Sequence, residues 1–133
     1  MGADEFTEIN YPVPEILVNG MDDVVNISQA LIDEITITAS LDSYGRTDNV
    51  DWWLAQVGPY GIFYLTPSMW TPVQTPFYQG PLFPIATYGF SPIATSGLAT
   101  GTYILYFSVD TVVDGRVSFD DIYTSFVIVN ITR

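Results

Sequence analysis

The chain has 133 residues, a hydrophobic content of 48% and a net charge of −12, which fit one folded domain and argue against disorder. Three arginines are its only basic side chains, so it lacks the cations that bind nucleic acid or an anionic membrane surface. Cysteine, histidine and lysine are absent, which removes thiolate chemistry, the usual general base and Schiff-base chemistry. No apolar run reaches the roughly 18 residues of a membrane span.

Residues 1–12 are polar and acidic and predict an extended N-terminal arm ahead of a domain at residues 13–133. Phe6, Ile9 and Tyr11 lie among acids in this arm, a pattern that favours a short strand and marks them as candidate self-assembly residues. The first residues lack the basic start and apolar middle of a signal peptide. If the protein is exported, its signal has therefore already been removed, and we expect an extracellular or cell-surface location with the signal peptide absent from this chain.

The first half of the domain predicts short strands separated by tight turns. Residues 15–19 and 22–27 are two such strands, joined by an Asn-Gly turn at residues 19–20. The strongest alternation runs over residues 31–41 and is typical of a half-buried antiparallel strand. Its expected inward-facing side chains are Ile35, Ile37, Ala39 and Leu41.

Residues 51–57 predict the next strand, which carries two consecutive tryptophans. We expect Trp53 to face the core together with Ala55 and Val57, and Trp52 to lie on the opposite face. A turn at residues 58–61 leads into a short strand at residues 62–65.

Residues 66–88 form a segment rich in proline and aromatic side chains, in which prolines interrupt any long strand or helix. This insertion belongs to a longer block, because no charged residue occurs between Asp51 and Asp110. Soluble surfaces usually intersperse charge. The block therefore indicates a surface that is covered by the arm of this chain or by another molecule.

A glycine turn at residue 101 opens a strongly alternating strand that ends at Asp110, and residues 122–131 predict the last strand. No segment shows helical periodicity. Short strands punctuated by glycine and proline indicate an all-β protein built as one antiparallel β-sandwich. The expected core side chains of the first of these strands are Tyr103, Leu105, Phe107 and Val109.

The acidic loop, residues 110–121, approximates the spacing of a calcium-binding loop, with Asp110, Asp114 and Asp121 as candidate ligands. Its third position is Val112, which offers no oxygen side chain. The alternative is a hairpin turn at residues 113–116 flanked by solvated acids. Calcium is thus the one cofactor that the sequence suggests.

Exposed aromatic side chains in and beside the insertion suggest a platform on which sugar rings stack. The alternative is a small core in which prolines and aromatics cover one end of the sandwich. A glycosidase needs two carboxylates held in a cleft, and no carboxylate occurs within the aromatic block. We therefore expect no catalytic activity. The candidate glycan-binding residues are Trp52, Trp70, Tyr78 and Tyr88.

The Gly-Thr-Tyr turn at residues 101–103 and the strand at residues 106–110 resemble immunoglobulin-like modules found in large secreted bacterial proteins. Residues 51–53 and 78–82 extend this resemblance, which covers roughly residues 13–131. It implies an immunoglobulin-like sandwich and a tyrosine that braces the turn.

In such modules the loop after the Val-Asp pair often resembles a calcium loop, and here Val112 and Ser118 depart from that pattern. Those modules are usually one part of a longer chain. The resemblance and the arm together suggest a non-catalytic structural subunit that forms a surface filament or layer, a homopolymer joined by strand addition. A carbohydrate-binding module, with a glycan as partner, and a calcium-stabilised spacer domain are the alternatives.

Overall fold

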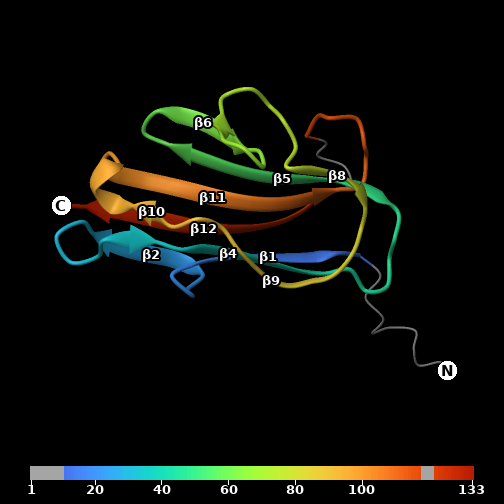
Figure 1. The fold of residues 1–133 in the computed structure, drawn as a ribbon, viewed down its shortest axis with the longest axis horizontal. Helices are drawn as coiled ribbons and strands as arrows, with labels where there is room; N and C mark the ends of the chain where they lie inside the picture. Colours follow the sequence, from blue (N-terminus) through green and yellow to red (C-terminus); the bar gives the residue numbers. More distant parts are fainter. Residues whose placement is uncertain (1–10, 118–121) are drawn as a thin grey trace.

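The computed structural model describes residues 11–117 and 122–133, and these residues form a sandwich of β-sheets (Figure 1). The fold is all-β, as the sequence predicts, with one short 3₁₀ turn at Thr95–Gly97. Within the described ranges, no helix has the length and apolar character needed to cross a membrane. The strands are β1 (Val13–Val18), β2 (Asp23–Ser28), β3 (Glu34–Ile35), β4 (Ile37–Asp42), β5 (Asn49–Gly58), β6 (Gly61–Leu65), β7 (Trp70–Thr71), β8 (Tyr78–Pro81), β9 (Ile85–Gly89), β10 (Ile93–Ala94), β11 (Gly101–Asp110) and β12 (Ile122–Thr132).

One layer is a small antiparallel sheet in the order β1-β4-β9. The short strand β3, just before β4, pairs with the short strand β10, just after β9. The other layer is a large sheet in the order β2-β12-β11-β5-β6-β7. Strand β8 pairs with the first residues of β5, and β6 pairs with the last ones. In the part of the chain that the structure describes, β9 has a strand partner on one edge only.

The N-terminal strands are divided between the two layers. β1 pairs antiparallel with β4 in the small sheet, whereas β2 pairs parallel with β12 in the large one. The unpaired side of β1 lies beside the first half of β12, where the Ile16 amide donates a hydrogen bond of 3.1 Å to Ser125 Oγ. This arrangement is compatible with an immunoglobulin-like module.

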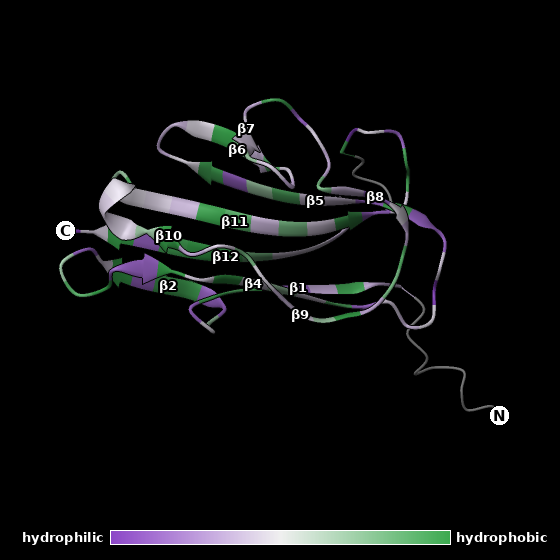
Figure 2. Cartoon of the chain, viewed as in Figure 1, coloured by the Kyte–Doolittle hydropathy of each residue, from purple (hydrophilic) through white to green (hydrophobic). Residues whose placement is uncertain are grey.

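The core lies between the sheets and follows the predicted alternation on three strands. All four inward-facing side chains expected for residues 35–41, and all four expected for β11, are buried. Figure 2 shows apolar and polar residues alternating along these strands. Burying one face of each sheet against the other supplies the main stabilisation of such a fold. The most deeply buried aromatic is Phe107, which is 1% exposed.

The predicted facing of β5 is wrong. Trp52 and Leu54 belong to the core cluster, while Trp53 points to the outer face of the large sheet. Trp53 is nevertheless only 2% exposed, because Tyr64 packs edge-on against its indole at a centroid distance of 5.9 Å. Both faces of β5 are therefore buried at this point, and apolar alternation does not distinguish them.

A tyrosine braces the turn that leads into β11, as the resemblance implies. The Tyr103 hydroxyl donates a hydrogen bond of 2.8 Å to the Ala99 carbonyl oxygen, four residues upstream. The preceding 3₁₀ turn is held by the Gln29 side chain, which donates to the carbonyl oxygens of Thr95 and Leu98 at 2.6 and 2.8 Å. A β-carbon at Gly58 would come within 2.6 Å of the Tyr103 ring, so the packing of this corner requires glycine there.

The proline-aromatic insertion folds back along β5. Its backbone contributes β7 and β8 to the large sheet and β9 to the small one, each five residues or shorter. Leu82 anchors the connection between β8 and β9, since it is 1% exposed and its amide donates to the Asp48 carbonyl oxygen at 2.9 Å. The insertion thus joins the two layers at one flank of the sandwich.

Candidate functional site

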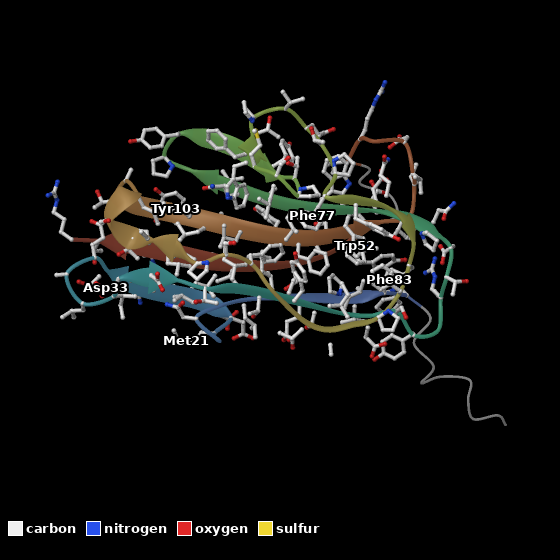
Figure 3. The ribbon with its side chains drawn as sticks, in the orientation of Figure 1. Met21, Asp33, Trp52, Phe77, Phe83 and Tyr103 are labelled. Atoms are coloured by element: carbon white, nitrogen blue, oxygen red, sulfur yellow. The ribbon has the colours of Figure 1, made fainter. Side chains whose placement is uncertain are left out.

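The aromatic residues of the insertion gather between the layers at one end of the sandwich. Figure 3 shows Trp52, Phe77 and Phe83 together at the end away from Tyr103. The Trp52 ring lies 4.6 Å from that of Tyr78 and 5.1 Å from that of Phe83, measured between ring centroids. The cluster comes from β5, β8 and the connections around them, so the insertion is an ordered part of the core.

This cluster surrounds a cavity of about 420 Å³, which we call the aromatic cavity. Its inner wall includes Phe107 and Leu54, both buried, and its outer rim includes Phe83 and Tyr88, which are 44% and 49% exposed. No lining residue carries a charge. The residues that line it are Ala39, Trp52, Leu54, Pro67, Phe77, Tyr78, Phe83, Ile85, Tyr88, Phe90 and Phe107.

A second, more polar hollow adjoins the aromatic cavity on the surface. This hollow of about 360 Å³, the outer cleft, shares Pro67, Phe77, Tyr88 and Phe90 with it. It adds the Trp70 indole and the hydroxyl groups of several small side chains. The cleft residues that are not shared are Ile37, Leu65, Thr66, Ser68, Met69, Trp70, Gly89, Ser91, Pro92 and Ile93.

The four predicted glycan-binding residues therefore lie around two connected hollows. Trp52, Tyr78 and Tyr88 line the aromatic cavity, and Trp70 and Tyr88 line the outer cleft. Trp52 is only 6% exposed, so it belongs to the core and offers no exposed face to a sugar. Trp70 and Tyr78 are half-buried and Tyr88 is exposed, and of these three Trp70 and Tyr88 line the outer cleft.

The acidic loop begins at a carboxylate that is completely buried. Asp110 is 0% exposed, and one of its oxygens accepts a hydrogen bond of 2.9 Å from the Val112 amide. Asp114 accepts from the Arg116 amide at 3.0 Å. Asp121 lies outside the described residues. In the ranges that the structure covers, no three acidic side chains come together as a metal-binding group.

Asp51 is a buried carboxylate that the sequence prediction missed. It stands directly across from Asp110 in the β5–β11 register and is also 0% exposed. Its two oxygens accept hydrogen bonds from Gln79 Nε2 at 2.8 Å and from the Gly115 amide at 3.0 Å. It therefore ties the acidic loop and β8 to the large sheet. The sequence contains one signal for this buried carboxylate, because Asp51 opens the predicted strand at residues 51–57 and the other residues of that strand carry no charge.

Part of the outer face of the large sheet is apolar and uncharged, which the sequence prediction also missed at the level of residues. One row of directly paired residues crosses five strands, from β2 to β6. A second row lies beside it, where the Tyr106 and Phe126 rings are 6.0 Å apart. We call these two rows the apolar face. Its members are Val24, Ile128, Ile104, Val57 and Ile62 in the first row and Phe126, Tyr106, Ala55 and Tyr64 in the second.

Polar side chains border the apolar face on one side. Asn130 Nδ2 donates to Asn26 Oδ1 at 3.0 Å, and the Thr102 hydroxyl donates to Asn130 Oδ1 at 2.8 Å. These bonds form a ladder across β2, β12 and β11. Several members of the apolar face remain open to solvent, with Val24 and Phe126 both 53% exposed.

Of the predicted self-assembly residues, Phe6 and Ile9 lie outside the described residues. Tyr11 stacks on Tyr123 with ring centroids 5.3 Å apart and planes 7° apart. It is 45% exposed. This stack fixes the start of β1 against the start of β12.

Three groups among the described residues have a shifted pKa. The hydrogen bonds from the Arg46 guanidinium, at 2.7 and 3.1 Å, lower the pKa of the Asp48 carboxyl and raise that of Arg46. Both side chains are partly exposed, so we expect this ion pair to stabilise the fold by less than about 1 kcal/mol. Burial raises the pKa of Tyr103, with a smaller contribution from Tyr60.

No protein-family model and no curated protein sequence matches the chain. Its function is therefore inferred from the geometry of its own residues.

Proposed function

We propose that this chain is a non-catalytic, extracellular structural module that associates with copies of itself through the apolar face. The observation that supports this proposal is an unbroken apolar row across five strands in a chain with a net charge of −12. Two acidic copies repel each other wherever their carboxylates meet, so they can associate most easily through a face that carries no charge.

The dimensions of the apolar face favour weak, reversible association. Neighbouring strands lie about 4.8 Å apart, so five strands and their side chains span roughly 20 Å. The two rows then present roughly 300 Å² from each copy, below the roughly 600 Å² that separates transient contacts from stable ones. Face-to-face packing of two such sheets is a common geometry in β-proteins. A two-fold contact places the same residues on both sides.

Charge placement supports a salt-dependent association. None of the nine residues of the apolar face is charged, although the chain carries fifteen acids, so a contact through this face would bury none of their carboxylates within the two rows. Repulsion between these acids extends over a Debye length, which is about 8 Å at physiological ionic strength and longer in dilute buffer. We therefore expect association to strengthen as salt rises.

Strand addition supplies a second contact, which would link the pairs into a filament. The unpaired edge of β9 leaves backbone donors and acceptors that an extended segment of a neighbour could satisfy. The arm carries apolar side chains among acids and is the segment that we propose for this contact. An arm and an edge are different surfaces, so their contact is head-to-tail and propagates unless it closes into a ring.

The absence of catalysis is supported by residue chemistry. The sequence has no cysteine, histidine or lysine. Asp51 and Asp110, which face each other in the β5–β11 register, are both completely buried and therefore out of reach of a substrate. Both hollows described above are lined by uncharged residues.

Sedimentation of two matched variants tests the apolar face. Phe126→Lys places a cation in the second row, and Leu31→Lys makes the same charge change at an 82% exposed side chain in the loop between β2 and β3. We expect Phe126→Lys to weaken association at least about tenfold, because it buries an unpaired charge in the contact. Leu31→Lys should sediment like the unmodified chain. A chain that stays monomeric at high concentration and high salt, or equal behaviour of both variants, would refute the proposal.

Removing residues 1–10 tests the arm separately and leaves the Tyr11–Tyr123 stack in place. We expect electron microscopy of the truncated chain to show pairs and no assembly larger than a pair. Filaments or layers formed equally well without these residues would show that the arm is not the connector.

A carbohydrate-binding module is the second candidate, and the outer cleft is the observation that favours it. There the accessible aromatics Trp70 and Tyr88 line the same hollow as Thr66, Ser68 and Ser91, whose hydroxyls suit a sugar. A glycan array probed with the unmodified chain and with Trp70→Ala tests this function. Binding that is lost in the variant supports it, and no binding to any glycan removes it.

A further inference from the structure

Two tyrosine rings stack on each other where the chain enters the sandwich. Tyr11 lies two residues before β1 and Tyr123 is the second residue of β12. Their ring centroids are 5.3 Å apart, and the ring planes are inclined by only 7°. All nine tyrosines of the chain lie in the described ranges, and among the described residues no other two tyrosine rings are in contact.

We propose that this pair is a modification site, at which one-electron oxidation couples the two rings through a carbon–carbon bond and forms a dityrosine cross-link. The link staples the start of β1, in the small sheet, to the start of β12, in the large sheet. The sequence excludes two other covalent staples, because it has no cysteine for a disulfide and no lysine for an isopeptide bond. The inference goes beyond the proposed structural role and does not depend on self-association.

The geometry of the stack favours coupling. Aromatic carbons in contact lie about 3.5–4.0 Å apart. Two parallel rings at that spacing, with centroids 5.3 Å apart, are offset, so the rim of one ring lies over the rim of the other. Coupling joins one of the two ring carbons beside each hydroxyl, and a flip of either ring exchanges those two carbons. Small rotations of the side chains therefore bring a reactive pair together without unfolding either strand.

The surroundings hold Tyr123 in place and leave Tyr11 open to an oxidant. The Tyr123 backbone pairs with Val109 in the β11–β12 register, and its side chain is half-buried. The Arg46 guanidinium, whose pKa is raised mainly by Asp48, also interacts with the Tyr123 hydroxyl. Tyr11 is 45% exposed, so a small oxidant can reach its ring from solvent.

The coupling step balances as a two-electron oxidation. Each phenol gives up one electron and its hydroxyl proton, which leaves two phenoxyl radicals. The radicals join at one ring carbon each, and the hydrogens on those two carbons move to the oxygens and restore both hydroxyls. The chain loses two hydrogen atoms in total. The oxidant takes up two electrons and two protons, as when a peroxidase reduces one hydrogen peroxide to two waters.

The cross-link closes the chain into a ring from residue 11 to residue 123. A covalent link restricts the unfolded chain, and the restriction grows with the number of residues that the link encloses. Nearly the whole domain lies within this ring. We therefore expect the coupled chain to melt about 5–15 °C above the uncoupled one.

Photo-oxidation followed by tryptic mapping tests the site. The probe is tris(bipyridine)ruthenium(III), which is generated by light with persulfate as the electron acceptor, and its positive charge draws it to this acidic chain. The protein is kept dilute, so that coupling between chains is suppressed. Trypsin cuts after Arg46 and Arg116 and so places Tyr11 and Tyr123 in different peptides. We expect peptides 1–46 and 117–133 to be joined, with the mass of the pair lowered by two hydrogens.

Matched phenylalanine variants identify the two rings, and each variant keeps an aromatic ring so that the packing is retained. Tyr44 is the control for Tyr11, because it lies in the same tryptic peptide, is 44% exposed and contacts no other tyrosine ring among the described residues. We expect Tyr11→Phe and Tyr123→Phe to abolish the joined peptide pair. Tyr44→Phe should leave its yield unchanged.

The proposal fails if peptides 1–46 and 117–133 are never joined under conditions that couple free N-acetyltyrosine. It also fails if the pair forms equally well in Tyr11→Phe or in the chain unfolded by urea, since the stack then does not direct the coupling. A coupled chain that melts at the temperature of the uncoupled one would show that the link staples nothing. Sedimentation of the unoxidised chain measures self-association separately, so failure here leaves the proposed function untouched.

Discussion

Replacing Tyr103 by phenylalanine removes one hydrogen bond from the turn before β11 and leaves the ring packing in place. The lost bond is 2.8 Å long and joins a buried hydroxyl to the Ala99 carbonyl oxygen. Such a bond contributes about 0.5–1.5 kcal/mol net, and the carbonyl left behind is half-buried. We therefore expect Tyr103→Phe to lower the free energy of unfolding by about 1 kcal/mol, or the melting temperature by roughly 3–5 °C.

The same substitution has a pH signature. Burial raises the pKa of Tyr103 in the folded chain above its unfolded value of about 10. The unfolded chain therefore releases this proton first as pH rises, and the stability that the neutral phenol contributes is lost progressively above about pH 10. The phenylalanine variant has no such proton. The difference in stability between the two chains should thus be full at neutral pH and shrink above about pH 10.

Urea unfolding followed by fluorescence at several pH values measures this difference, with the slope of the transition checked for constancy. A difference below about 0.3 kcal/mol at neutral pH would show that the hydroxyl is satisfied equally well by water. A difference that stays constant to about pH 11 would contradict the burial that raises the pKa of Tyr103.

Three further predictions concern the core and the acidic loop. Gly58→Ala should destabilise the fold by about 1–3 kcal/mol, because its new methyl group overlaps the Tyr103 ring, whereas Gly89→Ala has open space and serves as the control in the same urea assay. Trp53→Ala should cost about 3–5 kcal/mol although Trp53 lies on the outer face, because the indole is buried under Tyr64, and a cost below 1 kcal/mol would show that this cover is not formed in solution. Calcium should raise the melting temperature only if the candidate ligands Asp110, Asp114 and Asp121 converge on one ion, so superimposable melting curves in chelator and in millimolar calcium would exclude the site.

The sequence predicts the inward-facing side chains of a strand well where one face of the strand is buried and the other is exposed to solvent. Residues 35–41 alternate cleanly, and the inward-facing side chains there and at residues 103–109 are those expected, although Ile104 and Tyr106 on the outer face of β11 are apolar as well. The same method assigns the wrong face of β5, because Trp52 and Trp53 are both buried, one in the core and one beneath Tyr64. Alternation carries no information where both faces of a strand are covered.

The surfaces are harder to predict because they depend on cross-strand register. Residues as distant in sequence as Val24, Ile62 and Ile128 meet in one row, and only the pairing of five strands brings them together. The absence of charge between Asp51 and Asp110 indicates a covered surface but does not identify which face of the fold is covered. The cavity is likewise absent from any local pattern, since its walls come from β4, β5, β9, β11 and the insertion.

The parallel pairing of β2 with β12 determines how the module bears tension. β1 begins at the end of the sandwich opposite the C-terminus, and β1 and β2 run in the direction of β12 (Figure 1). A pull on the two ends first loads β1, which pairs with β4, and once β1 has detached it drags β2 and β12 past each other along their length. The six registered pairs from Asp23–Val127 to Ser28–Thr132 then carry the load together, whereas a hairpin pulled open at one end would release its pairs one by one. A subunit held in a filament under flow would in this way resist unravelling from its termini.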